Sequence, residues 1–206
     1  MTLWNRSAQD LLEATTSHQP TPGGGSVAAL SGAFGVGLVC MALNITRRKQ
    51  PQQAGALQGP LEALMALQAD LRRLADEDAQ VFRAYVAATR LPRATDEEQA
   101  ARQDALDRAG AQAREVPLQV AGAAVQALDL ANEVLSDVHP EVQSDVGAGA
   151  GLLLGTLHAS LLTLDINLRH LDGEARSGLE AQREALHRQG TTLAAQVLSR
   201  THELLR

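Results

Sequence analysis

The sequence predicts an all-α protein, a multihelical array of long antiparallel helices. Helix-forming residues dominate the 206-residue chain, whereas Phe, Trp and Tyr together make up only 2% of it. Signals of β-structure, such as alternating β-branched runs and Asn-Gly turns, are almost absent. Apolar residues instead recur three and four positions apart, the spacing of one helix face. The core must therefore consist of Leu, Ala and Val, and the length suits a single domain over residues 1–206.

The first half of the chain is expected to form three helices. Ser7 and Asp10 give the first of them a capping signal. A loop over Ser17–Gly25 precedes the second helix, and a connection rich in Pro and Gly over Gln50–Gly59 precedes the third. The expected helices are, in order, Leu3–Thr15, Ser26–Thr46 and Leu61–Arg90.

The second half should contain further helices separated by Pro and Gly. Thr95-Asp96-Glu97-Glu98 has the pattern of a capping box, which opens a helix. That helix should reach about Val116, where Pro117 kinks or breaks it, and an apolar face continues beyond the proline. Ser144 and Asp145 are expected to cap the next helix. The remaining boundaries are a break at Val138-His139-Pro140, a helix end near Leu171, an interruption at Asp172-Gly173 and a last helix over Ser177–Leu205.

The stretch Thr21-Pro22-Gly23-Gly24-Gly25-Ser26 is the most unusual part of the sequence. Consecutive glycines let another group approach the main chain closely, and Ser26 is expected to be the N-cap of the following helix. Gly32, Gly35 and Gly37 each cost that helix about 1 kcal/mol relative to alanine, so something must pack very close to it. The stretch fits neither a Walker A motif nor a dinucleotide fingerprint. A ligand-contacting loop and a plain tight turn are equally compatible with it.

Two uncharged runs, Val27–Ile45 and Val146–Leu164, have nearly the length that spans a bilayer. Both are rich in Gly, Ala, Ser and Thr, and His158 interrupts the second run. The other expected helices are amphipathic and charged. We therefore expect two buried helices packed on each other or across a dimer, and no membrane partner; a membrane hairpin is the alternative.

Charge and cysteine content narrow the classes of function. The formal charge is −6, and the only basic cluster, Arg47-Arg48-Lys49, is too small for a nucleic-acid surface. The single cysteine, Cys40, lies in an apolar helix, which suits a small core residue and a reducing, cytoplasmic setting. No set of His, Cys and carboxylate residues has the spacing of a metal site.

Asp78 interrupts the apolar seam of the third expected helix. The seam consists of Leu64, Leu67, Leu71, Leu74, Val81, Tyr85 and Ala88, and Asp78 occupies the slot between Leu74 and Val81. A carboxylate among apolar side chains is protonated, paired or used in chemistry, and proton transfer is one such use. Partial exposure, or a pair with an Arg from a neighbouring helix, is the structural alternative. Asp76 lies nearly across the helix and is interpreted as a solvated residue.

Other polar residues give weaker signals. Asn44, Thr46 and Lys49 lie at the far end of the glycine-rich helix, and Lys49 is suited to contact a substrate carboxylate. A solvated lysine is the ordinary interpretation of that residue. Ser144 and Asp145 are interpreted from the sequence pattern as helix caps rather than catalysts.

Six segments together carry a family resemblance. They are Pro22–Ala29 with the small-residue helix behind it, Asn44-Ile45-Thr46 with Lys49, Asp76–Phe82 ending in Leu91-Pro92, Val116-Pro117-Leu118, Ser144-Asp145-Val146 and Ile166-Asn167-Leu168. In this order and at these intervals they resemble the cyclodeaminase domain of formimidoyltransferase-cyclodeaminase. The same family includes stand-alone bacterial methenyltetrahydrofolate cyclohydrolases. The resemblance covers nearly the whole chain.

The resemblance implies an all-helical homodimer that binds a tetrahydrofolate. Asp78 matches the family's catalytic aspartate. The implied substrate-binding residues are Pro22, Gly23, Gly24, Gly25, Ser26, Asn44, Lys49, Ser144 and Asp145. His139 and Thr163 depart from the family pattern, which has asparagine at each position, and these departures bear on substrate preference.

The implied reaction is that of a formiminotetrahydrofolate cyclodeaminase, which releases ammonia and forms 5,10-methenyltetrahydrofolate without a metal or redox cofactor. Two alternatives stay open. One is a methenyltetrahydrofolate cyclohydrolase, and the other is a folate-binding or interaction module without catalysis.

Overall fold

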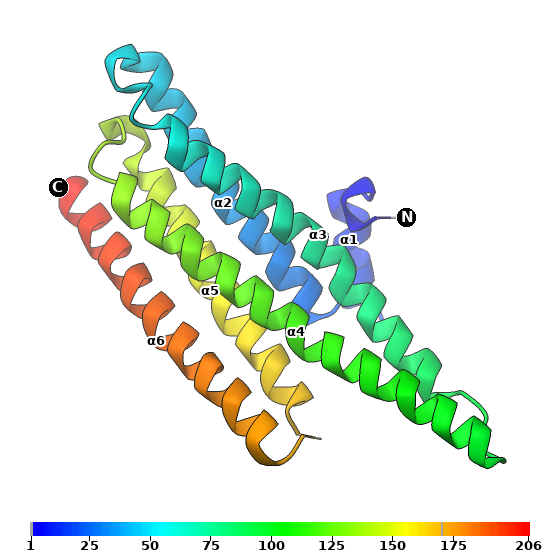
Figure 1. The fold of residues 1–206 in the computed structure, drawn as a ribbon. Helices are drawn as coiled ribbons and strands as arrows, with labels where there is room; N and C mark the ends of the chain where they lie inside the picture. Colours follow the sequence, from blue (N-terminus) through cyan, green and yellow to red (C-terminus); the bar gives the residue numbers. More distant parts are fainter. Residues whose placement is uncertain (1, 170) are drawn as a thin grey trace.

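Long helices make up most of the computed structural model, which describes residues 2–169 and 171–206. The α-helices are α1 (Ala8–Thr16), α2 (Gly24–Lys49), α3 (Gln58–Thr89), α4 (Asp96–Val134), α5 (Gln143–Asn167) and α6 (Gly173–Leu204), with short 3-10 turns at Leu3–Asn5, Pro51–Gln53 and Pro140–Val142. Figure 1 shows the five long helices side by side, and α3 and α4 extend past the others where they join. No strand occurs in the described residues, and the predicted all-α array of long antiparallel helices is confirmed.

Several predicted boundaries shift by a few residues. The first predicted helix is divided into the turn Leu3–Asn5 and α1, because Ser7 caps α1 instead of lying inside a helix. The Ser7 Oγ accepts a hydrogen bond from the Asp10 N–H at 3.0 Å, and the Asp10 side chain accepts from the Ser7 N–H. At the other end of the chain, α5 ends at Asn167 rather than near Leu171, and α6 begins at Gly173 rather than at Ser177.

Of the kink or break predicted at Pro117, the break is wrong, because the helix that begins after Thr95 continues beyond the proline. The capping box of Thr95 and Glu98 forms as predicted, but α4 then continues through the buried Pro117 to Val134 as one helix. A proline inside a helix leaves the carbonyl four residues earlier without its usual donor. In this protein that carbonyl receives another donor, which is described with the site below.

The glycine-rich helix α2 packs directly against α5, as its composition predicts. A Cβ at Gly149 of α5 would lie 2.7 Å from the Gly35 carbonyl oxygen of α2, and a Cβ at Gly35 would lie 3.0 Å from the Gly149 oxygen. The Thr156 hydroxyl of α5 donates to the Ala28 carbonyl of α2 at 3.1 Å. The two backbones approach this closely only because both contact positions lack a side chain.

The core consists of Leu, Val and Ala, as predicted, and within the described part of the chain no aromatic side chain is buried. Cys40 belongs to this core, and burial raises the pKa of its thiol to about 11, so it is an unreactive packing residue. Two helical segments, Gly24–Lys49 and Pro140–Asn167, are long and apolar enough to cross a membrane, but 67% and 50% of their most apolar stretches are buried inside the protein. Core helices of a helical bundle have the same property.

Replacing Gly149 by Ala is expected to destabilise the protein by about 1–3 kcal/mol, because the new methyl group would push α5 away from the α2 backbone. Chemical denaturation measures the difference. Gly122→Ala in α4 is the matched control, since a Cβ there meets nothing within 4 Å, and it should leave stability equal or slightly higher. Equal effects of the two substitutions would contradict the close helix contact.

Candidate active site

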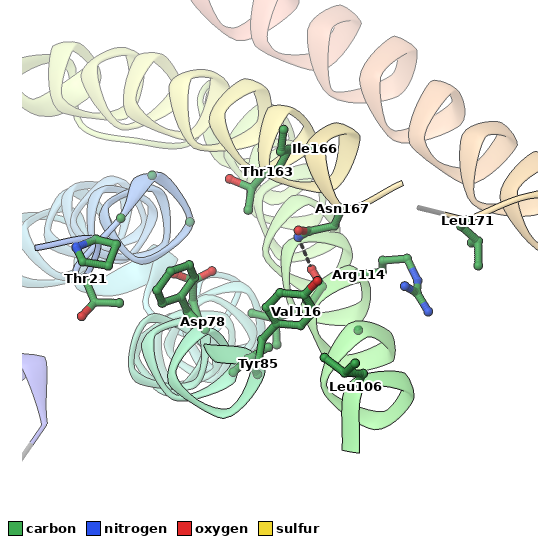
Figure 2. Close-up of a pocket in the computed structure, with 18 of the residues that line it drawn as sticks. Thr21, Asp78, Tyr85, Leu106, Arg114, Val116, Thr163, Ile166, Asn167 and Leu171 are labelled. Atoms are coloured by element: carbon green, nitrogen blue, oxygen red, sulfur yellow. Dashed lines mark hydrogen bonds between the residues drawn. The ribbon is translucent and has the colours of Figure 1, made fainter. Parts of the chain in front are cut away.

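A cavity of about 810 Å³ opens between the start of α2, the middle of α3, the first half of α4 and the end of α5. Gly23, Gly24 and Gly25 line it from one side and Asp78 from α3 adjoins them. Figure 2 shows that side chains from α3, α4 and α5 surround the same space. The triple glycine therefore lines a cavity and is more than a plain turn.

The Asp78 carboxylate lies directly on the first turn of α2. A Cβ at Gly25 would overlap this carboxylate, with its Cγ only 2.7 Å away, so no other residue fits at Gly25 while Asp78 keeps its place. The Ser26 hydroxyl donates to Asp78 Oδ2 at 2.6 Å and fixes the orientation of the group. Asp78 itself is only partly buried, because its other side faces the cavity. The carboxylate is thus held in place by α2 and open to a ligand.

Ser26 does not cap α2, and that prediction is wrong. The helix begins at Gly24 with Gly23 as its N-cap, so Ser26 is the third helical residue and its hydroxyl is used by Asp78. Ser26 is fully buried, and Pro22, which follows a cis Thr21–Pro22 peptide bond, is buried too. Pro22 and Ser26 therefore do not line the cavity, whereas Gly23, Gly24 and Gly25 do.

Apolar and aromatic side chains form much of the remaining wall. Phe82 and Tyr85 follow Asp78 by one and two turns of α3, and they are two of only four Phe, Trp and Tyr residues in the chain. Leu106 of α4 and Ile166 of α5 also line the cavity. A flat aromatic ligand placed here would bury its faces against these side chains while one edge meets Asp78.

Asn167 at the end of α5 joins the cavity to the proline of α4. Pro117 has no N–H to donate to the carbonyl of Ala113, four residues earlier, and the Asn167 side-chain Nδ2 donates to that carbonyl at 2.6 Å instead. Both Ala113 and Asn167 line the cavity. This bond explains how α4 continues through Pro117. Sequence reasoning could identify the free carbonyl, but not the residue 54 positions away that satisfies it.

Four predicted substrate-binding residues lie elsewhere in the chain. Asn44 and Lys49 are at the C-terminal end of α2, and Ser144 and Asp145 are in the first turn of α5. None of them lines the cavity at Asp78. The stretch of α5 from Ser144 to Thr163 corresponds to about 28 Å along the helix. Within one chain, the structure therefore does not bring these four residues to the carboxylate.

The far end of α2 has a structural network of its own. The Lys49 ammonium pairs with Glu141, and both side chains are partly solvated. The buried Thr46 hydroxyl accepts a hydrogen bond from the His139 N–H at 2.9 Å. Ser144 and Asp145 do not supply the N-cap of α5, since the cap position is Val142. Predicting them as caps is therefore wrong, although both lie in the first turn.

The two predicted departures from the family pattern fall in different places. Thr163 lines the cavity, and its hydroxyl would be 3.9 Å from a Cβ at Gly24, so this position can influence which ligand fits. His139 lies at the opposite end of the bundle, where its ring Nδ1 accepts from the Glu141 N–H at 3.3 Å. It therefore has a local structural contact in this chain.

Fold and cavity together define an all-helical protein with a single oriented carboxylate at a glycine-lined helix start, facing a largely apolar ligand pocket. The sequence model of the formiminotransferase-cyclodeaminase family matches residues 7–185. The chain therefore belongs to the formiminotransferase-cyclodeaminase family, as its sequence segments predict.

Individual relatives differ in how much of their length corresponds to this chain. The methenyltetrahydrofolate cyclohydrolase of Methylorubrum extorquens is 34% identical over 173 residues, covering 83% of both proteins. The formimidoyltransferase-cyclodeaminase of Sus scrofa is 29% identical over 96% of this chain, which spans 37% of that protein. The crystal structure of formiminotetrahydrofolate cyclodeaminase from Thermotoga maritima has the same fold, with a TM-score of 0.85, 21% identity and coverage of 98% of this chain and 99% of that one.

Asn167→Ala is expected to destabilise the protein by about 1–2 kcal/mol, because it leaves the Ala113 carbonyl without a donor. In a Pro117→Ala background the loss should shrink to less than half, since the substituted alanine regains the N–H that can bond this carbonyl. A double-mutant cycle of unfolding free energies measures the coupling. Strictly additive effects would show that Asn167 does not replace the missing helix bond.

Proposed function

We propose that this protein is an enzyme of folate one-carbon metabolism, a formiminotetrahydrofolate cyclodeaminase that converts 5-formiminotetrahydrofolate to 5,10-methenyltetrahydrofolate and ammonia. The observation that carries the proposal is the Asp78 carboxylate, oriented by Ser26 on the glycine turn and open to an aromatic-lined cavity. The formimidoyltransferase-cyclodeaminase of Sus scrofa and the cyclodeaminase of Thermotoga maritima support this reaction, and all the relatives named above support an enzyme that acts on folates.

The reaction needs one group that moves a proton between two nitrogens. With the formimino group as an amidinium, N10 attacks its carbon, so the N10–C bond forms and the former C=N bond becomes a C–NH₂ single bond. Asp78 takes the proton from N10 and gives it to this NH₂, which leaves as ammonia when the C–N bond breaks. The methenyl bridge keeps the positive charge. Atoms and charges balance when the only group the protein supplies is one that transfers a proton. The proposal therefore includes no metal or redox cofactor.

The cavity contributes orientation to this chemistry. Ser26 donates to Asp78 Oδ2, and this holds the carboxylate at one rotation. Phe82 and Tyr85 offer apolar surface to the pterin and aminobenzoyl rings. A substrate folded so that N10 faces the formimino carbon reacts intramolecularly, which removes much of the entropic barrier.

Cyclohydrolase activity is the second candidate, favoured by the relative from M. extorquens, which matches over 83% of both chains. In that reaction water adds to the methenyl carbon and loses one proton; the N5–C bond then breaks, N5 takes the proton of the new hydroxyl group, and 10-formyltetrahydrofolate forms. Asp78 could accept the proton of the attacking water. Absorbance of the methenyl form separates the two activities, because cyclodeamination produces it and hydrolysis consumes it. A protein that changes neither folate would be the non-catalytic binding module.

Asp78→Asn should lower turnover by about 10²–10⁴-fold while the protein stays folded, because the amide keeps the shape but cannot carry the proton. Steady-state kinetics and circular dichroism measure the two effects.

Asp107→Asn is the matched control, since Asp107 is the other carboxylate lining the cavity but lies on α4 and bonds to Gln103. It should retain turnover within a few-fold. Unchanged activity of the Asp78 variant would refute the assigned role.

The homodimer implied by the family resemblance is also part of the proposal, with the outer face of α2 and α5 as its interface. Large apolar side chains are exposed along this face, with Phe34 63% and Leu162 66% accessible. Met41, Leu152 and Ile166 continue it, and α5 carries no charged residue from Val146 to Leu164. A second copy of the same face is uncharged and equally apolar, which makes it a suitable partner.

A two-fold axis perpendicular to the helices would make the dimer antiparallel. The cavity end of one copy would then adjoin the far end of α2 and α5 of the other. In this arrangement Asn44, Lys49, Ser144 and Asp145 of one copy would reach the folate near Asp78 of the other. The proposal thus keeps these four residues as substrate contacts that one copy supplies to the other. It places the dimer in the cytoplasm, without a nucleic-acid or membrane partner.

Leu162→Glu should produce a monomer in multi-angle light scattering, because it places a charge in an apolar interface. Leu12→Glu is the matched control: Leu12 is also 66% exposed but lies on α1, outside this face, and the protein should remain dimeric. Mixing inactive Asp78→Asn and Asn44→Ala proteins should restore turnover, because one site of each mixed dimer is intact. A dimeric Leu162→Glu protein would refute the interface, and failed restoration would refute the shared site.

A further inference from the structure

Arg114 is the basic residue among the described side chains that line the cavity. It lies on α4 and is partly buried. The ion pairs of the described residues involve other basic side chains and leave Arg114 without an acidic partner. A guanidinium that is partly withdrawn from water and not neutralised by the protein is suited to receive an anionic group of a ligand.

The position of Arg114 is remote from the glycine turn. Figure 2 shows Asp78 beside the start of α2 and Arg114 on the other side of the view, with the Tyr85 ring between them. The guanidinium lies along α4, and a Cβ at Gly110 would come within 3.3 Å of its Nη1. Gly110 therefore leaves room for the side chain to lie against its helix and line the cavity.

The order of groups in a folate matches the order of side chains in the cavity. A folate consists of a pterin, the bridge with N10, an aminobenzoyl ring and a glutamate with two carboxylates. With the bridge at Asp78, the aminobenzoyl ring would lie against Tyr85 and the glutamate would extend toward Arg114. The reverse orientation, with the bridge kept at Asp78, would place the uncharged pterin toward Arg114 and leave the guanidinium without an anionic partner.

We infer that Arg114 determines specificity for the carboxylate end of the substrate and thereby fixes the direction in which the folate enters, an inference that rests on the proposed function. Asp107, the second acidic residue that lines the cavity, does not neutralise the Arg114 guanidinium. Asp107 lies two turns before Arg114 on α4, the ion pairs of the described residues do not join the two side chains, and Asp107 Oδ1 accepts from the Gln103 side chain at 2.8 Å. A glutamate carboxylate of the ligand at this position would therefore contact the positive Arg114 guanidinium rather than the Asp107 carboxylate.

The test compares two ligands that differ only in charge at this end. One is 5-formyltetrahydrofolate, which has the shape of the formimino substrate, and the other is its glutamate diamide, in which both carboxylates are replaced by uncharged carboxamides. Titration calorimetry gives their dissociation constants. Arg114→Gln should weaken binding of the folate by about 10- to 100-fold and change binding of the amide less than about three-fold, because a charge-assisted bond is lost only with the folate. Arg114→Lys should restore part of the folate affinity.

Arg108→Gln is the matched control, because Arg108 lies on the same helix, pairs with Asp104 and does not line the cavity. It should bind both ligands as the wild type does. Equal weakening of both ligands by Arg114→Gln would show a merely structural role, and unchanged binding of both would show no role; either result overturns the inference.

Turnover of 5-formiminotetrahydrofolate and of 5,10-methenyltetrahydrofolate is measured in parallel. Wild-type protein that binds but converts neither folate refutes the proposed reaction, while the dissociation constants still decide the role of Arg114. Wild-type protein that binds neither ligand refutes both.

Discussion

The contact between the Asp78 carboxylate and the backbone of Gly25 is the constraint on which the site depends. A carboxylate can lie on the first turn of α2 only if that turn has no side chain at this point. The Ser26 hydroxyl, one residue later, then lies within hydrogen-bond distance of the same group. Two adjacent residues of α2 thus provide the space and the orientation for an acid that belongs to α3. This explains why a helix-destabilising glycine stretch stands at the start of a helix that the rest of the bundle packs against.

The contact between α2 and α5 sets the position of the first turn of α2. Gly35 and Gly149 let the two backbones meet, and Thr156 bonds across them to Ala28. Because α5 is held so close, its last turns reach the cavity, where Thr163 and Asn167 face the glycine loop and α4. Asn167 then supplies the donor that Pro117 lacks, so α4 remains one helix and its wall of the cavity stays continuous. Helix packing and cavity shape are therefore fixed by the same small set of contacts.

The cavity has a polarity that suits a ligand with distinct ends. A carboxylate adjoins the glycine turn, aromatic and aliphatic side chains form the middle, and the guanidinium of Arg114 lies on the other side. Such a sequence of groups favours one orientation of an elongated ligand over the other. The apolar outer face of α2 and α5 begins beside this cavity and extends along both helices as far as Met41 and Leu152, toward the end of the bundle where Asn44, Lys49, Ser144 and Asp145 lie. Site and proposed interface thus share the same two helices.

Features that depend on neighbours within about four residues are predictable from the order of amino acids alone. Helical periodicity, the capping boxes at Ser7 and Thr95 and the slot of Asp78 in an apolar seam are of this kind. The glycines of α2 also predicted a close partner, because their cost in a helix requires compensation.

Contacts between residues far apart in the chain depend on how the helices pack, and local patterns do not predict them. The Ser26 hydroxyl donates to Asp78, 52 residues away, instead of capping α2. The Asn167 side chain donates to the Ala113 carbonyl, 54 residues away, and α4 continues through Pro117. Arg114 carries no local signal, since a surface arginine and one lining a cavity look alike in sequence. Local patterns report hydrogen bonds along one helix, whereas these roles arise from the relative placement of α2, α3, α4 and α5, which core packing sets.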